Sequence, residues 1–293
     1  MLLKPDCIPC ILKMVIAYAR KLSDDEDGCR QLLTRFLGIG ALRGQNWDIT
    51  SPEAIEPVMD MLIETFGVSD PFIGVKEEEN ARALELYPFF KQSVRQSEDP
   101  LFAAVNLAIM GNRVDIMVFD RLDDLKEVLA QNPLRPVSKE AFESFRQKLA
   151  QSPRLLYLGD NSGEIVFDRL LIETITDLYH PQITFAVRNL PALNDVTLAE
   201  ARRVGMDSVA GLVSNGLDGC VCGTLLSRCS EQFRDLFAQC DLVISKGGGN
   251  FETLENQTQH CRNITFMLLS KCAPYCNYFK TGMFEPVLMN CFQ

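Results

Sequence analysis

The densest group of chemically capable residues in the sequence is the hexapeptide GDNSGE at residues 159–164. It places two carboxylates, one amide and one hydroxyl between the apolar run 155–158 and a second apolar stretch that begins at Ile165. Such a position indicates a turn that leaves a buried strand and enters a helix. Carboxylate and amide oxygens suit hard divalent cations, and the free N–H groups at a helix start favour a phosphate. The turn therefore offers groups for a metal ion and for an anion.

Similar residues follow other short apolar runs, which are spaced by helical segments along residues 151–293. Continuous apolar strands alternating with helices are typical of a parallel sheet covered on both faces. The ligands of such a sheet bind at the carboxyl ends of its strands, so these turns are expected to meet at one edge. The runs are 155–158, 183–187, 209–213, 242–245 and 264–269, and the polar residues that follow them include Arg188, Asn189, Asn194, Asp195, Lys246 to Asn250, Ser270, Lys271 and Cys272.

The first half of the chain has a different, helical texture. Ser51 and Pro52 suit a helix start, apolar residues then recur every three or four positions, and Gly67 suits the helix end. We expect similar helices near 8–22, 75–96 and 138–150. The prediction is an α/β fold: an N-terminal all-α domain or cap over residues 1–150 and a Rossmann-like three-layer domain with a mostly parallel sheet over residues 151–293.

Asp160, Asn161 and Asp195 form the predicted metal site. These oxygen ligands suit Mg²⁺ or Mn²⁺ better than catalytic zinc, because neither histidine of the chain lies in these turns. Lys246 precedes three glycines, which lets backbone N–H groups approach an oxyanion closely while the lysine adds charge. The chain has no GxxxxGK[ST] loop. A metal beside a lysine and a helix start at Ser162 suits hydrolysis of a phosphate ester.

Each motif also has a purely structural interpretation. Asp160 and Asp195 are each placed to cap a helix, and Lys246 with its glycines is also consistent with a plain turn. Because all of them follow successive strands, core packing and capping alone explain their joint appearance poorly.

Composition excludes several classes of function. The 293 residues carry a formal net charge of −10, which disfavours nonspecific binding to nucleic acid or to anionic lipid. The apolar N-terminus is interrupted by Asp6 and Lys13 and lacks a small-residue cleavage site, so we interpret it as an amphipathic helix rather than a signal peptide. No segment has the ~20 uninterrupted apolar residues of a membrane span. A cytoplasmic protein is expected.

The chain contains 11 cysteines, which we expect to be mostly reduced in such a compartment. Cys7 and Cys10 form a CxxC pair whose spacing suits a structural metal or a redox pair, although simple packing at a helix start also explains it. No second CxxC completes a four-cysteine zinc site.

As a set, these motifs resemble the metal-dependent damage-control phosphatase family, formerly domain of unknown function 89 and also called acidic-residue-methyltransferase-like. The resemblance covers nearly the whole chain, and CIPC resembles the subfamily with an N-terminal CxxC. It is carried by GDNSGEIVFDRLLIE, VRNLPALNDVT, SKGGGNFE, CIPC and LAIMGNRVD at residues 107–115.

The resemblance implies an α-helical portion on a Rossmann-like domain and a divalent Mn²⁺, Co²⁺, Ni²⁺ or Mg²⁺ ion. It implies hydrolysis of small phosphorylated metabolites such as sugar phosphates, nucleotides or damaged derivatives. By position, Asp160, Asn161 and Asp195 match the metal ligands and Lys246 matches the phosphate-contacting lysine. SKCAPYCNYF departs from the small-residue run expected there, which leaves Lys271 less defined. Residues assigned to substrate binding or to support of the site are Ser162, Gly163, Glu164, Arg188, Asn250 and Asn112.

Three other functions are compatible with parts of the sequence. LYLGDNSGE superficially resembles the glycine-rich loop of methyltransferases that use S-adenosylmethionine, but it lacks the GxGxG spacing. A non-catalytic module that binds a phosphorylated metabolite is disfavoured by the carboxylates, which repel phosphate. A redox protein built around Cys7 and Cys10 predicts no dependence on a divalent metal.

Overall fold

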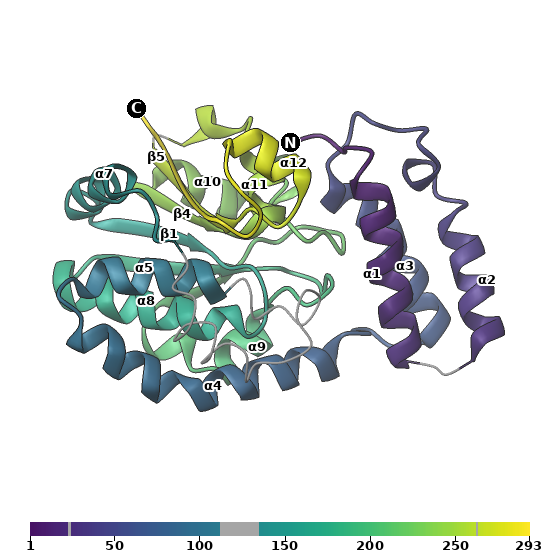
Figure 1. Ribbon diagram of the computed structural model, residues 1–293, viewed down its shortest axis with the longest axis horizontal. Helices are drawn as coiled ribbons and strands as arrows, with labels where there is room; N and C mark the ends of the chain where they lie inside the picture. Colours follow the sequence, from purple (N-terminus) through teal and green to yellow (C-terminus); the bar gives the residue numbers. More distant parts are fainter. Residues whose placement is uncertain (23–24, 112–134, 262) are drawn as a thin grey trace.

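A six-stranded sheet forms the centre of the molecule (Figure 1). The computed structural model describes residues 1–22, 25–111, 135–261 and 263–293. The strand order is β3-β2-β1-β4-β5-β6, with the first five strands parallel and β6 antiparallel to β5. This confirms the predicted mostly parallel α/β fold. The strands are β1 (Arg154–Leu158), β2 (Gln182–Val187), β3 (Gly211–Ser214), β4 (Leu242–Lys246), β5 (Asn263–Leu269) and β6 (Pro286–Phe292).

The predicted strands agree closely with the observed ones because the central strands are buried on both faces. Every residue of β4 is buried, as are the last four of β1. The edge strand β6 was not predicted, since most of its residues are only half-buried and Asn290 interrupts the apolar pattern. The Asn290 side chain nevertheless contacts the neighbouring strand β5, because Thr265 Oγ1 donates to Asn290 Oδ1 at 2.9 Å.

Helices cover both faces of the sheet and form a separate group beside it. The predicted helices near 8–22, 51–66, 75–96 and 138–150 are confirmed, whereas α2 and α5 were not predicted. The helices are α1 (Cys7–Leu22), α2 (Glu26–Phe36), α3 (Ser51–Phe66), α4 (Ile73–Gln96), α5 (Pro100–Gly111), α7 (Lys139–Ala150), α8 (Glu164–Tyr179), α9 (Leu198–Arg203), α10 (Glu231–Gln239), α11 (Gly247–Leu254) and α12 (Ala273–Phe279).

Helix α3 shows how the local sequence sets a boundary. Its N-cap is Thr50, whose side chain accepts from the Glu53 N–H while Glu53 accepts from the Thr50 N–H. The predicted cap, Ser51, is therefore the first helical residue instead. Gly67 ends the helix with φ +65°, a conformation that glycine adopts without steric cost, as predicted.

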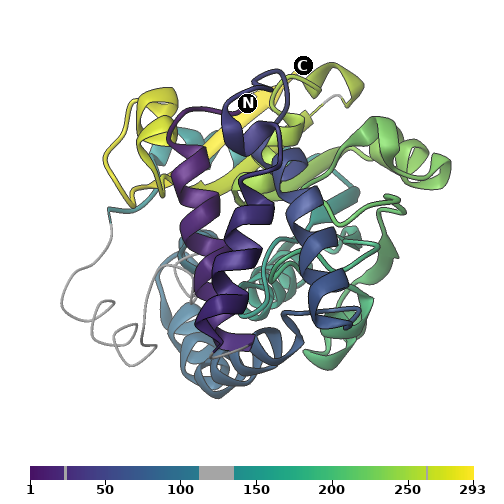
Figure 2. The ribbon, with the colours of Figure 1, turned by 90° about the vertical axis from the view of Figure 1, so that its right-hand side faces the viewer.

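Three hydrophobic clusters divide the core. Helices α4, α5, α7 and α8 pack with one face of the sheet, and α10 to α12 pack with the other face, which gives the three layers in Figure 1. Helices α1 to α3 share a third cluster and stand together at one end of the molecule (Figure 2). Because α4, α5 and α7 share the core of the sheet, we propose that the separate helical unit ends near the start of α4 rather than at residue 150.

Within the described residues, no helix is both long and apolar enough to cross a membrane.

Candidate functional site

Two turns pair with each other at the carboxyl edge of the sheet and bring the predicted metal ligands together. The Val196 N–H donates to Asp160 O at 2.9 Å, and the Ser162 N–H donates to Asn194 O at 2.9 Å. Asn161 and Asp195 form an antiparallel bridge between these turns. The side chains of Asp160, Asn161 and Asp195 are all buried. The turn after β1 and the turn after β2 thus meet as the strand-end rule predicts.

Arg188, at the end of β2, joins the two carboxylates. Its Nε lies 2.6 Å from Asp195 Oδ2, and its Nη2 lies 3.5 Å from Asp160 Oδ1. The guanidinium is held on its other side by Asn250, whose Oδ1 accepts from Arg188 Nη1 at 2.9 Å. The arginine is itself buried, so a fixed positive charge stands between two buried carboxylates.

Asn250 also ties the ends of two strands together. Its Nδ2 donates to the carbonyl oxygen of Gly159 at 3.0 Å and to that of Lys246 at 2.8 Å. One side chain on α11 therefore fixes the turn after β1, the end of β4 and the arginine between the carboxylates. The sequence placed Asn250 in the site, and the structure brings it there.

The glycines that follow Lys246 are not an open loop. Residues 247–254 form α11, and Gly247 has φ +78°. A Cβ atom at Gly247 would lie 1.7 Å from Asp160 Oδ2, so only glycine lets α11 begin this close to the carboxylate. These residues pack a helix start against a predicted metal ligand, and their role as an anion cradle stays a prediction.

Lys246 is buried, and its ammonium has three acceptors within the protein. It forms ion pairs with Glu164 and with Asp168, the latter at 2.6 Å, and it donates to Ala108 O at 2.9 Å. Tyr157 donates to the same Asp168 oxygen at 2.7 Å. A phosphate contact would require one of these interactions to break, so the role of Lys246 in binding phosphate stays a prediction.

The backbone amides of Ser162 and Gly163 also have acceptors within the protein. The Gly163 N–H donates to Asn80 Oδ1 at 2.7 Å, while the Ser162 N–H donates to Asn194 O. A phosphate contact from these two amides would require these hydrogen bonds to break, so that role stays a prediction. Ser162 Oγ is buried and has no hydrogen-bond partner among the described residues.

Helix α4 contributes side chains that the sequence interpretation did not include. Lys76, Glu79 and Asn80 are all buried, at the three-and-four spacing that continues into Ala83. Glu79 accepts from Asn194 Nδ2 at 3.2 Å, so α4 contacts both turns of the site. The sequence signal for their burial was that these three polar residues share one helix face with the apolar residues of α4.

The electrostatics of the carboxylates favour a cation. Burial raises the pKa of Asp160 well above its usual value, and the negative charges of Asp195 and Glu164 raise it further. Arg188 and Lys271 oppose this shift without cancelling it. No three Asp, Glu, His or Cys side chains of the described residues converge on a metal position. Two carboxylates completed by the Asn161 amide fit a divalent cation, which would relieve their repulsion.

The family profile described as the damage-control phosphatase ARMT1-like domain matches residues 3–287. The chain belongs to this family. A damage-control phosphatase of Archaeoglobus fulgidus is 31% identical over 281 residues, which cover 94% of each chain. One from Pyrococcus horikoshii is 32% identical over 215 residues, 72% of this chain and 71% of its own.

The shared fold extends to a solved structure. The crystal structure of a DUF89 family protein from Pyrococcus horikoshii has a TM-score of 0.84 and 26% sequence identity, covering 99% of both chains. The predicted family is confirmed, and phosphatase activity is the function that membership in the damage-control phosphatase family supports.

Asn112 and the pair Cys7 and Cys10, which the sequence analysis singled out in this family member, do not belong to the paired turns that the structure describes. Asn112 lies outside the described residues. Cys7 is half-buried and Cys10 is exposed in the first turn of α1, and burial raises the pKa of both thiols. Whether these cysteines bind a metal stays open.

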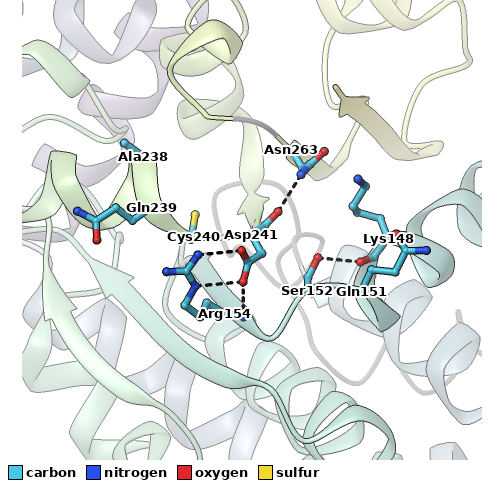
Figure 3. A pocket seen from close by; sticks show the side chains of 9 residues that line it. All are labelled: Lys148, Gln151, Ser152, Arg154, Ala238, Gln239, Cys240, Asp241 and Asn263. Carbon is cyan, nitrogen blue, oxygen red and sulfur yellow. Dashed lines mark hydrogen bonds and ion pairs between the residues drawn. The ribbon is translucent and has the colours of Figure 1, made fainter.

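A hollow lies at the opposite edge of the sheet (Figure 3). It is lined near the amino ends of β1, β4 and β5, where Arg154 pairs with Asp241, and Asn263 donates to the Asp241 carbonyl at 2.9 Å. None of the residues assigned to the site of this damage-control phosphatase family member lines it.

Proposed function

We propose that this protein is a metal-dependent phosphatase that hydrolyses phosphate esters of small metabolites, such as sugar phosphates, nucleotides or their damaged derivatives. The observation that carries the proposal is the convergence of Asp160, Asn161 and Asp195 at the carboxyl edge of the sheet, with Arg188 between the two carboxylates. Family membership supports the phosphatase activity, the oxygen ligands suit Mg²⁺ or Mn²⁺, and the family resemblance adds Co²⁺ and Ni²⁺ to the ions proposed.

Asp160, Asn161 and Asp195 would hold the cation through oxygen atoms. An ion held there would supply a Lewis acid for the phosphoryl group and would lower the pKa of a bound water. The choice between the four ions depends on their availability as much as on the ligands, because these oxygen donors accept all of them.

The surrounding residues keep this ligand set in place. Arg188 fixes the orientation of both carboxylates, and Asn250 fixes Arg188. Lys246 balances the charge of Glu164 and Asp168 in the interior next to the turn. Because these groups are buried, their hydrogen bonds hold the site rigid before a substrate arrives, which lowers the cost of reorganisation during the reaction.

A small, negatively charged metabolite is the partner that this site suits. The net charge of −10 disfavours nucleic acid as a partner, and a cytoplasmic location is part of the same proposal.

Phosphate release by the purified protein tests the proposal. The protein is treated with a chelator and then assayed with p-nitrophenyl phosphate and a panel of sugar phosphates, with each of the four ions restored in turn. We expect release only with a metal and none from Asp160→Ala. Asp241→Ala is the control, because it removes an aspartate at the opposite edge of the sheet. Absence of release with every ion would overturn the proposal and favour a binding module.

A further inference from the structure

Helix α4 places a buried amide beside the turn that carries the predicted metal ligands. Asn80 is 2% exposed, and its Oδ1 accepts from the Gly163 N–H at 2.7 Å. Because a backbone N–H needs an acceptor, this contact fixes which end of the Asn80 side chain is the oxygen. The other end, Nδ2, is then a donor next to the turn.

That donor has no partner among the residues that the structure describes. Asn80 Nδ2 is buried and makes no hydrogen bond to any of the described residues. The same is true of Ser162 Oγ, which precedes the glycine that Asn80 holds. Buried polar groups nearly always have partners, and leaving them without one is costly. One of these groups belongs to the side chain that accepts from the Gly163 N–H, and the other belongs to the residue before Gly163, so both are available to a ligand oxygen or a water at this turn.

The cationic side chains Arg188 and Lys246 already contact carboxylates, although Arg188 Nη2 makes no hydrogen bond among the described residues. Arg188 contacts Asp160 and Asp195, and Lys246 contacts Glu164 and Asp168. A phosphate ester brings further negative charge into this acidic surrounding, so it needs donors that are not engaged. Asn80 Nδ2 and Ser162 Oγ supply neutral donors of this kind.

The position of Asn80 is set from both sides. Glu79, its neighbour on α4, accepts from Asn194 Nδ2 at 3.2 Å, and Asn194 O accepts from the Ser162 N–H at 2.9 Å. Helix α4 is thereby connected to both turns, and the Asn80 amide has little freedom to turn away.

We propose that Asn80 is a further substrate-binding residue, whose Nδ2 donates together with Ser162 Oγ to an oxygen of the substrate's phosphoryl group. The inference rests on the proposed phosphatase function and adds a contact from the helical part of the chain. Inorganic phosphate, the product of the reaction, would bind to the same donors.

Two substitutions at Asn80 separate this contact from its alternatives. Asn80→Asp keeps an oxygen for the Gly163 N–H but removes the donor and adds charge, whereas Asn80→Ala removes donor and acceptor without adding charge. Asn106→Asp is the matched control: Asn106 Oδ1 also accepts a backbone N–H, that of Val137 at 2.9 Å. Binding of inorganic phosphate to the Mn²⁺-loaded proteins is measured by calorimetry, and KM and kcat are measured with p-nitrophenyl phosphate.

We expect both Asn80 variants to bind phosphate about 10- to 100-fold more weakly, the effect of losing one hydrogen bond to a charged group, and to raise KM more than they lower kcat. Asn106→Asp should match the unmodified protein. Weakening in Asn80→Asp alone would indicate charge repulsion, and weakening in Asn80→Ala alone would indicate loss of the turn contact. Either result, or no change in both, would overturn the inference.

Failure of the function and failure of this inference give different results. Suppose that the unmodified protein releases no phosphate with any ion, while both Asn80 variants bind inorganic phosphate more weakly than the unmodified protein does. That result would refute the phosphatase function but support the anion contact. Thermal unfolding by circular dichroism shows whether each variant folds. If an Asn80 variant does not fold, Ser162→Ala tests the second donor, and unchanged phosphate affinity there would overturn the shared contact.

Discussion

The two ends of the sheet carry similar arginine–aspartate pairs in opposite surroundings. At the amino end, Arg154 and Asp241 form a two-bond ion pair, with 55% and 28% of the side chains exposed. At the carboxyl end, Arg188 and Asp195 form an ion pair through a single hydrogen bond, from Arg188 Nε to Asp195 Oδ2, with 3% and 4% of the side chains exposed. Water solvates the charged groups of the first pair even when they are apart, whereas those of the second pair are stabilised only by the protein groups around them.

This difference separates a surface contact from a site. A buried charge is costly, so a protein keeps one only when other groups compensate it or when function requires it. Arg188 has two carboxylates and Asn250 around it, and Asp160 still has a raised pKa. The carboxyl end thus retains a surplus of negative charge in the interior, which a divalent cation would offset.

Neutralising one aspartate at each end should give the largest difference. We expect Asp195→Asn to reduce metal-dependent phosphate release by more than about 100-fold, because even groups that only support metal ligands commonly contribute 10- to 100-fold. Asp241→Asn should change the rate less than about two-fold, since it lies away from the site. Rates with p-nitrophenyl phosphate and Mn²⁺ provide the measurement, and comparable losses in both variants would contradict the assignment.

Replacing the arginine at each end of the sheet should cause very different losses of folding stability. In the presence of a chelator, Arg188→Leu should lower the free energy of unfolding by about 3–5 kcal/mol, because it removes the buried cation that contacts two buried carboxylates. Arg154→Leu should have a much smaller effect, since its former partner, Asp241, remains in contact with water. Urea unfolding at pH 7 measures both, and an equal cost would show that burial does not distinguish the pairs.

The sequence was sufficient to predict the edge of the sheet where these residues meet. Apolar runs located β1, β2, β4 and β5, and the strand-end rule then brought Asp160 and Asp195 to one place. It could not predict which groups would pair. The acid at Asp168 lies one helical turn after Glu164, among apolar residues of α8, and only the tertiary fold shows that Lys246 reaches both.

Two further gaps have physical causes. The glycines after Lys246 were interpreted as an anion cradle or a plain turn, because sequence alone does not show that Gly247 must fit against Asp160. Asn80 lay in a run of acidic residues that is typical of a solvated helix face. Its burial depends on how α4 crosses the turns, which is a property of packing rather than of local sequence.

Asp168 provides a pH-dependent test at the carboxyl end. Burial, with the charge of Glu164 adding to it and Lys246 opposing it, raises the pKa of Asp168 from 3.8 to about 7. Between these two pH values, the Asp168 carboxyl group is therefore protonated in the folded state and ionised in the unfolded state. Stability from this group is fully present below pH 3.8 and is lost as the pH rises through about 7.

We expect the free energy of unfolding to fall more steeply between pH 5 and 7 in the unmodified protein than in Asp168→Asn, by up to about 1.4 kcal/mol per pH unit. Urea unfolding of the chelated proteins at several pH values measures this difference. Parallel curves would show that Asp168 titrates no differently in the folded and unfolded states.

The smallest expected effect comes from two buried serines, one near each end of β1. Ser152 Oγ donates to Lys148 O at 2.7 Å, whereas Ser162 Oγ has no partner among the described residues. Ser152→Ala should therefore lower the free energy of unfolding by about 1 kcal/mol, the net contribution of one hydrogen bond. Ser162→Ala removes a hydroxyl that the protein leaves unpaired, so stability should stay the same or rise slightly, while KM for a phosphate ester increases. An equal loss of stability in both variants, measured by urea unfolding without metal, would mean that the Ser162 hydroxyl serves the fold rather than a ligand.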